Sequence, residues 1–301
     1  MSILGTKGSD GALTTKENTN VVAGKTMTEA YKTALVELLY QLADDDLVFG
    51  HRSSEWLGLA PDLEEDIAFS SIAQDEVGHA AFFYSLIAEL TNQDADTLAF
   101  ARPSQERKNA RLLEQPNGDW AYTIARGFVY NTFEQVRLEA LLVSNYSPLQ
   151  QGVRKILREE RYHVLHLETW FERLGVAGGE ARKRVEDAVK RVWDDLQDLF
   201  SLGQFADALT VEGILPVTRE HLATAFEQAA RSVFERAGMI WPEMPLTHGE
   251  TDGVTDGVTD GVTDGVTDGV TDGRLGQHTE HLDELLSVMT EVYRSENGSS
   301  W

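Results

Sequence analysis

The stretch Glu76-Val77-Gly78-His79, together with its later counterpart Glu160-Arg161-Tyr162-His163, decides the fold of this chain. In each stretch an imidazole follows a carboxylate three residues later, a spacing that puts both side chains on one face of an α-helix. Apolar residues continue each face in steps of three and four, so both pairs lie on seams that face a helical core. These seams consist of Glu65, Phe69, Ile72, Phe83, Leu86 and Leu90 in the first helix, and Ile156, Leu167, Trp170 and Leu174 in the second.

Charged pairs inside a core need compensation, because burying an unpaired carboxylate is strongly unfavourable. A shared metal centre provides that compensation, and a metal-free network of polar groups is the alternative. In four-helix di-iron and di-manganese proteins, two helices each contribute Glu-x-x-His and two more each contribute one carboxylate. The sequence therefore predicts an all-α, ferritin-like four-helix bundle with a dinuclear metal site.

Two further helices are expected to supply the remaining carboxylates. Asp46 continues the apolar seam of a helix expected over residues 28–49, whereas Asp45 lies on a weaker neighbouring stripe and is the alternative. Glu134 lies on the seam of a helix expected over residues 119–145, and Glu139, on a wetter face, is its alternative. The predicted metal ligands are Asp46, Glu76, His79, Glu134, Glu160 and His163.

The residue types available restrict the metal. The chain has no cysteine, so disulfides, thiolate ligands and iron–sulfur clusters are excluded. Carboxylates combined with two imidazoles and open coordination positions suit iron or manganese. A di-iron centre is the first choice and manganese the second. Asp75 and Glu159 adjoin the ligand glutamates about 100° round each helix, which suits solvent-facing side chains or groups that orient the imidazoles.

Composition limits the partners and the compartment. Among 301 residues, 26 Lys and Arg face 50 Asp and Glu, which gives a net charge of −24. Nucleic acid is therefore not expected as a partner, because its phosphates would be repelled. No stretch of about 20 apolar residues is present to span a membrane, and the opening residues have no secretory signal pattern. We expect a cytoplasmic protein that has no membrane partner.

The rest of the chain is expected to form one domain. Residues 1–25 are predicted to be a flexible leader, and residues 26–301 a single ferritin-like helical domain. Within this domain, residues 249–274 form a low-complexity insertion with five tandem Thr-Asp-Gly-Val copies. Additional C-terminal helices are predicted over residues 180–202, 218–237 and 279–295, and His278 and His281 are expected on the surface.

Several motifs resemble a known family. The chain is similar to the C subunit of bacterial ring 1,2-phenylacetyl-CoA epoxidases from about residue 30 to residue 295, with the repeat as an insertion. The motifs that carry this resemblance are Leu42-Ala43-Asp44-Asp45-Asp46, His51-Arg52-Ser53-Ser54-Glu55-Trp56, Leu63-Glu64-Glu65-Asp66-Ile67-Ala68, Arg161-Tyr162-His163, Trp170-Phe171-Glu172-Arg173-Leu174-Gly175 and His278-Thr279-Glu280-His281-Leu282.

This resemblance implies a ferritin-like subunit of a multicomponent oxygenase, which epoxidises the aromatic ring of phenylacetyl-CoA in aerobic phenylacetate degradation. It also implies two partners: a catalytic ferritin-like sister subunit with di-iron ligands, and a separate reductase that delivers electrons from NADPH. In that family the C subunit is a structural partner with a degenerate metal site, whereas this chain carries Glu76 and His79. Two interpretations remain: a structural partner of the catalytic subunit, or a catalytic di-iron or di-manganese oxygenase or oxidase itself.

Overall fold

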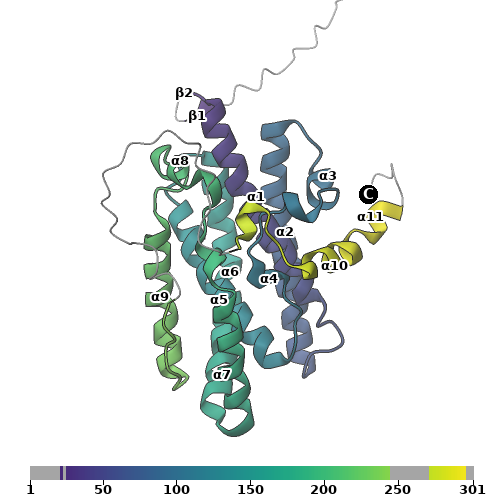
Figure 1. Cartoon of the computed structure of the whole chain (residues 1–301), viewed down its shortest axis with the longest axis vertical. Coiled ribbons are helices and arrows are strands. Elements are labelled where there is room, and N and C mark those ends of the chain that lie inside the picture. Colours follow the sequence, from purple (N-terminus) through teal and green to yellow (C-terminus); the bar gives the residue numbers. More distant parts are fainter. Residues whose placement is uncertain (1–20, 23–24, 245–270, 296–301) are drawn as a thin grey trace, which may run out of the picture.

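Four long helices form the body of the molecule (Figure 1). The computed structural model describes residues 21–22, 25–244 and 271–295. Helix α1 spans Glu29–Ser54, α2 Leu63–Thr91, α5 Trp120–Leu141 and α6 Ser147–Ala177. Helix α1 packs along α2, α5 packs along α6, and α2 also contacts α6. The prediction of an all-α, ferritin-like four-helix bundle is confirmed.

The ends of these helices follow local chemistry. The Asp62 side chain accepts a hydrogen bond from the Glu65 amide at 2.9 Å, which caps the N-terminus of α2. Helix α1 extends to Ser54, more than a turn beyond the predicted end at residue 49. The buried guanidinium of Arg52 stabilises this last turn, because it donates a hydrogen bond to the Glu114 carbonyl at 2.6 Å.

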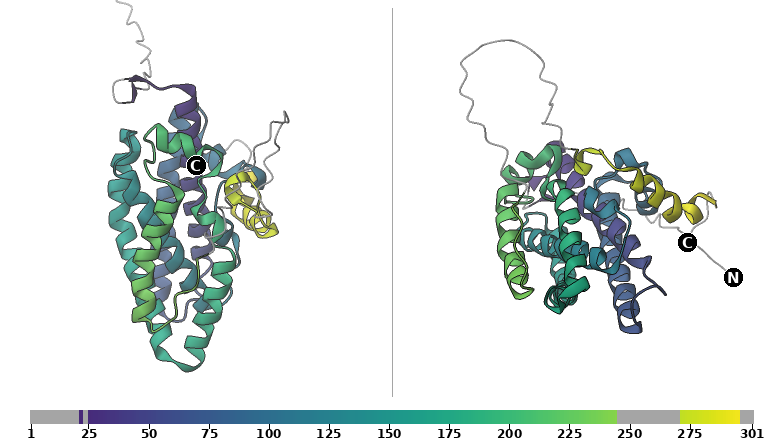
Figure 2. Two further views of the ribbon diagram at one scale, coloured as in Figure 1. Left: turned by 60° about the vertical axis from the view of Figure 1, so that its left-hand side comes forward. Right: turned by 60° about the horizontal axis from the view of Figure 1, so that its bottom comes forward.

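Shorter elements connect and flank the bundle. Figure 2 shows α9 and α10 on opposite sides of it. Before the bundle lie two short paired strands, and the connection between α2 and α5 is built from short helices with buried arginines. The remaining elements are β1 Val21–Val22, β2 Lys25–Thr26, α3 Ala95–Phe100, η1 Ser104–Glu106, α4 Arg111–Glu114, α7 Gly179–Asp194, η2 Gln197–Phe200, η3 Gly203–Phe205, α8 Ala206–Val211, α9 Arg219–Arg236, η5 Gly273–Leu275, α10 Glu280–Met289 and α11 Glu291–Ser295.

The predicted leader and insertion lie largely outside the described residues. Residues 1–20 and 245–270 are among those not described, so these two assignments stay predictions. Residues 271–274 are described, and within them Gly273 and Arg274 are buried in the folded body.

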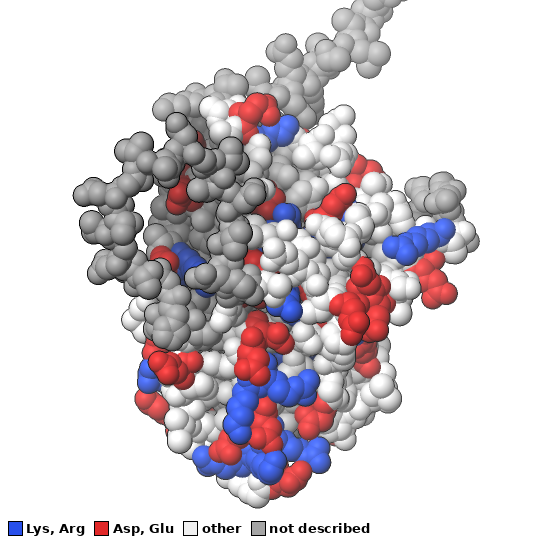
Figure 3. Space-filling view, viewed as in Figure 1, with Lys and Arg blue, Asp and Glu red and all other residues white. Residues whose placement is uncertain are grey.

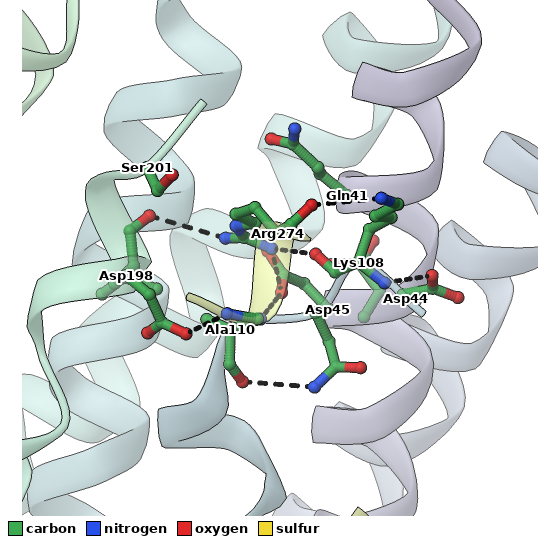
Figure 4. A network of polar contacts seen from close by, with 12 residues as sticks. Gln41, Asp44, Asp45, Lys108, Ala110, Asp198, Ser201 and Arg274 are labelled. Atoms are coloured by element: carbon green, nitrogen blue, oxygen red, sulfur yellow. Dashed lines mark hydrogen bonds and ion pairs between the residues drawn. The ribbon is translucent and has the colours of Figure 1, made fainter. Parts of the chain in front are cut away.

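Arg274 anchors the C-terminal segment to the bundle (Figure 4). Its guanidinium is fully buried and donates at 2.7 Å both to the Asp45 carboxylate of α1 and to the Lys108 carbonyl. The adjoining amide of Gly273 donates to Asp198 at 3.0 Å. A Cβ on Gly273 would lie only 2.2 Å from the Asn109 carbonyl oxygen, so this approach requires glycine.

His278 strengthens the same anchor, contrary to the expectation that it lies on the surface. Its side chain is only 3% exposed, forms an ion pair with Glu114, and lies 2.9 Å through Nε2 from the Arg107 carbonyl oxygen. The expectation failed because the sequence does not reveal that this segment folds back onto α4. His281, 31% exposed, is more accessible.

Surface charge is mixed rather than uniformly acidic on the face in Figure 3. Lys and Arg there gather along α7 between acidic side chains. Ion pairs one turn apart explain the pattern, such as Lys183 with Asp187 at 2.6 Å and Arg184 with Glu180 at 2.8 Å. No helix in the described part of the chain has the length and apolarity needed to cross a membrane.

The Arg274 anchor can be tested by an Arg274→Met substitution. We expect the free energy of unfolding to fall by about 3 kcal/mol, because Asp45 and the Lys108 carbonyl would lose a buried charged partner. Arg294→Met, which changes an exposed arginine of the same segment, is the control and should change it by about 0.5 kcal/mol at most. Equal effects of the two substitutions in urea denaturation would show that the anchor is unimportant.

Candidate metal centre

Three of the four long helices bring five predicted ligands together inside the bundle. Asp46 comes from α1, Glu76 and His79 from α2, and Glu160 and His163 from α6, and all five are buried. Their ligand atoms form two groups within 4.8 Å, one of Asp46, Glu76 and His79 and one of Glu76, Glu160 and His163. Glu76 is common to both groups, so its two carboxylate oxygens could contribute to both.

The second glutamate lies between the two imidazoles. Oε1 of Glu160 is 3.2 Å from Nδ1 of His163 and 3.3 Å from Nδ1 of His79. Nδ1 of His163 also lies 3.5 Å from Oε1 of Glu76. The ring centroids of the two histidines are 6.2 Å apart. Both Nδ1 atoms therefore face the shared carboxylates, as ligands of two neighbouring cations would.

The outer ring nitrogens are held crosswise by the opposite helix. Nε2 of His79 lies 2.9 Å from Glu159 of α6, and Nε2 of His163 lies 3.2 Å from Asp75 of α2. Asp75 directly precedes Glu76, and Glu159 directly precedes Glu160. Each of the two helices therefore supplies the carboxylate that orients the imidazole of the other helix. Carboxylates in this position fix the tautomer and orientation of a metal-binding histidine. Helical periodicity placed Asp75 and Glu159 off the seam, but it could not show that they reach across to the facing helix.

Glycines allow the close approach of helices at this centre. A Cβ on Gly50 of α1 would lie 3.0 Å from Cβ of Glu76, and a Cβ on Gly127 of α5 would lie 3.0 Å from the Leu167 side chain. The absence of these side chains lets α1 approach α2, and α5 approach α6. Tyr130 of α5 then donates its hydroxyl to Asp46 at 2.7 Å and fixes that carboxylate.

The contacts of the remaining candidate metal ligands distinguish between them. Asp45, the alternative to Asp46, accepts hydrogen bonds from Arg137 at 2.9 Å and from the Ala110 amide at 2.8 Å, so its oxygens are engaged elsewhere. Glu139, the alternative to Glu134, is exposed. Glu134 is buried, but among the described residues it belongs to neither ligand group, because its Oε2 accepts a hydrogen bond from Nε of Arg137 at 2.7 Å.

Burial and mutual charge shift the pKa values of the cluster. Burial raises the pKa of Asp46 well above its usual range, with Glu134 and Glu76 adding to the rise. Burial and the neighbouring Glu160 raise the pKa of Glu76 to about 7. Glu160 differs: hydrogen bonds from His163 and His79 outweigh the effect of burial and lower its pKa to about 2.

The imidazoles respond in the opposite sense. Burial alone would lower their pKa values, but the hydrogen bonds with Glu160 and the charge of Glu76 raise the pKa of His79 to about 9 and that of His163 to about 11. Without a metal, the cluster is therefore stabilised by two imidazolium cations beside the carboxylates. A metal ion would replace these protons.

The donor set fits a metal. The buried oxygens without a hydrogen-bond partner in the described residues include both of Glu76, Oε2 of Glu160 and Oε1 of Glu134. Buried polar atoms are nearly always partnered, so the free oxygens of this cluster could serve as ligands of a cation. Carboxylates and imidazoles are ligands for iron and manganese.

Two hollows open beside the centre on the outer face of α2 and α6. One of about 590 Å³ reaches His163, and the other of about 530 Å³ reaches His79. Asp75 and Glu159 line both hollows and so stand between solvent and the imidazoles. Glu65 and His166, 2.9 Å apart, lie in the larger hollow beside the aromatic side chain of Trp170.

The bundle and its buried carboxylate–histidine cluster define a ferritin-like protein with a candidate two-metal centre. Comparison with known proteins gives the family. The chain belongs to the family of phenylacetic acid catabolic proteins, whose family model matches residues 14–260.

Two proteins of Escherichia coli strain K12 are similar in sequence to this chain. The C subunit of its 1,2-phenylacetyl-CoA epoxidase is 32% identical over 262 residues, which cover 87% of this chain and 96% of that relative. The A subunit of the same epoxidase is 28% identical over 177 residues, which cover 56% of this chain and 54% of that relative. The resemblance to C subunits stated from the sequence is confirmed.

Metal binding should depend steeply on pH. Because the pKa values of His79 and His163 are raised to about 9 and about 11, both imidazoles carry the second proton that makes them cationic at pH 7 in the metal-free protein. Binding must release these protons, so the affinity for Mn²⁺ should rise between pH 6 and pH 8, by about tenfold per pH unit for each proton released. Calorimetric titration in buffers of different ionisation enthalpy measures the protons released, and a pH-independent affinity contradicts this assignment.

The crosswise carboxylates should tune the affinity without being ligands. We expect Glu159→Gln and Asp75→Asn each to weaken Mn²⁺ binding by about 10- to 100-fold, because an amide holds the imidazole less firmly and lowers its basicity. Glu64→Gln, an exposed position on α2, is the matched control and should leave binding unchanged. Unchanged affinity in the two test variants would leave these contacts without a role in the centre.

Proposed function

We propose that this protein is a C-type subunit of a multicomponent oxygenase that epoxidises the ring of phenylacetyl-CoA in aerobic phenylacetate degradation. The observation that carries the proposal is the similarity to the C subunit of the Escherichia coli epoxidase, which extends over 96% of that relative. A ferritin-like bundle matches the role, and the weaker similarity to the A subunit is consistent with two related chains in one assembly.

The partners follow from this role. The chain would associate with a catalytic ferritin-like sister subunit, and a separate reductase would deliver electrons from NADPH; phenylacetyl-CoA is the substrate of the whole assembly. Exposed apolar side chains on α2 and α6 support a protein-binding role for the bundle surface. These side chains are Leu63, Ile67 and Val77 on α2, and Tyr162, Leu165 and Val176 on α6.

The chain would also hold a dinuclear metal centre of its own, with iron as the first choice and manganese as the second. Asp46, Glu76, His79, Glu134, Glu160 and His163 are the proposed ligands. A bound pair of iron ions would supply the electron transfer that activates dioxygen. The residues of this chain would place the ions, hold the imidazole protons on the outer nitrogens and keep the inner face of the centre dry.

A second candidate function is that the chain is itself a catalytic di-iron or di-manganese oxygenase or oxidase. The specific observation in its favour is the set of buried carboxylates and imidazoles around two neighbouring positions. A purely structural partner has no need of such a set, because buried charges are expensive to keep. The two functions differ in whether the assembly requires the metal ligands of this chain.

Co-expression with the A subunit of the epoxidase from its own organism tests both functions. We expect the two chains to purify together and this chain to contain two metal ions, which Glu76→Ala and His163→Ala remove. If epoxidation of phenylacetyl-CoA persists with Glu76→Ala in this chain, its role is that of a structural partner. Loss of epoxidation from an intact assembly would establish the catalytic alternative, and failure of the chains to associate would overturn the proposed role in the assembly.

A further inference from the structure

One proposed ligand is withheld from the centre. Each of the two ligand groups could hold one ion, and the group around His79 already includes the terminal carboxylate of Asp46. The group around His163 has Glu76 and Glu160 but, among the described residues, no such terminal carboxylate. By its place on the fourth helix, Glu134 is the residue expected to fill that position.

Arg137 holds Glu134 away from that position. It lies one turn further along α5, is 1% exposed, and donates from Nε to Oε2 of Glu134 at 2.7 Å. Its Nη1 donates to Oδ2 of Asp45 at 2.9 Å. A planar guanidinium that bonds two carboxylates in fixed directions is a rigid partner, so Glu134 cannot turn towards the cluster without leaving it.

Asp45, the second carboxylate bonded by Arg137, also has other partners. Asp45 receives Arg274 at 2.7 Å and the Ala110 amide at 2.8 Å on its other oxygen. Asp45 therefore stays neutralised whether or not Arg137 is present. Oε1 of Glu134, in contrast, is buried without a hydrogen-bond partner. Arg137 is therefore the partner that fixes Glu134, and the second oxygen of Glu134 remains available for a ligand role if Arg137 is removed.

We propose that the two metal positions of the centre are unequal and that Arg137 makes them so. The position of Asp46, Glu76 and His79 binds its ion first. The position of Glu160 and His163 binds its ion more weakly, because the ion pair with Arg137 keeps Glu134 from serving as the terminal carboxylate that this position lacks. Arg137 is a positioning residue, since it acts only through Glu134. This inference rests on the metal centre proposed above.

Titration of the metal-free protein with Mn²⁺, followed by electron paramagnetic resonance, tests the inference without any activity measurement. The wild-type chain should bind one ion and then a second at least tenfold more weakly, with the spin-coupled signal appearing only in the second step. In Arg137→Gln the second step should tighten at least tenfold and merge with the first. Arg137→Lys keeps a cation near Glu134 and should restore most of the gap.

A matched control uses another buried arginine of the same helix. Arg126 bonds the Gln115 carbonyl and Asn117 and does not contact Glu134, so Arg126→Gln should leave both steps unchanged. If Arg137→Gln fails to fold, Glu134→Gln decides the matter. Because Glu134 is already withheld, this change should weaken the second step less than threefold in the presence of Arg137, and a greater loss overturns the inference.

The failures of the two proposals are distinguishable. Binding of two Mn²⁺ ions in equal steps by the wild-type chain, or an unaltered second step in Arg137→Gln, overturns the role of Arg137 and leaves the metal centre intact. No Mn²⁺ bound by the wild-type chain at pH 8 overturns the metal centre itself, and this inference with it.

Discussion

The neutralisation of buried carboxylates is the constraint on which this structure depends. Three consecutive aspartates of α1, from Asp44 to Asp46, are all buried, and each has a different solution. The pKa of Asp44 is lowered to about 2 because Arg102 and Arg107 outweigh the effect of burial. Asp45 takes two arginines, and Asp46 faces the cluster of glutamates and histidines.

These three solutions explain why parts of the chain far apart in sequence meet at α1. The connection between α2 and α5 supplies arginines to Asp44, and the segment after the repeat supplies Arg274 to Asp45. An uncompensated charge in the core costs several kcal/mol. Each aspartate therefore favours the conformation in which the distant segment brings its arginine into contact with it. The C-terminal segment (yellow in Figure 1) is thereby fixed beside α4 as part of the same charge balance.

Helical periodicity in the sequence predicts which side chains face the core, but it does not predict contacts between residues that are far apart in the chain. The four long helices and the inward direction of Glu76, His79, Glu160 and His163 follow from steps of three and four, so they could be predicted. Arg274 could not, because nothing near it in the sequence shows that its partner is Asp45, 229 positions away. Glu134 could be predicted as a buried ligand, but its ion pair with Arg137 could not, because the spacing of the two residues does not show that Arg137 is buried as well.

The spacing of the Glu-x-x-His motifs is not the only feature of the molecule that favours a metal. Asp44 and Asp45 of the same core are bonded by arginines, whereas the cluster around Glu76 leaves several oxygens free. Arginines supply charge and rigid hydrogen bonds, but they also close a carboxylate to other ligands. Asp45 is bonded by arginines, whereas Glu160 is bonded only by imidazoles, so the site around Glu160 stays open to cations. If the cluster served stability alone, apolar residues would serve it better, because replacing a buried charged network with well-packed apolar side chains is often neutral or stabilising.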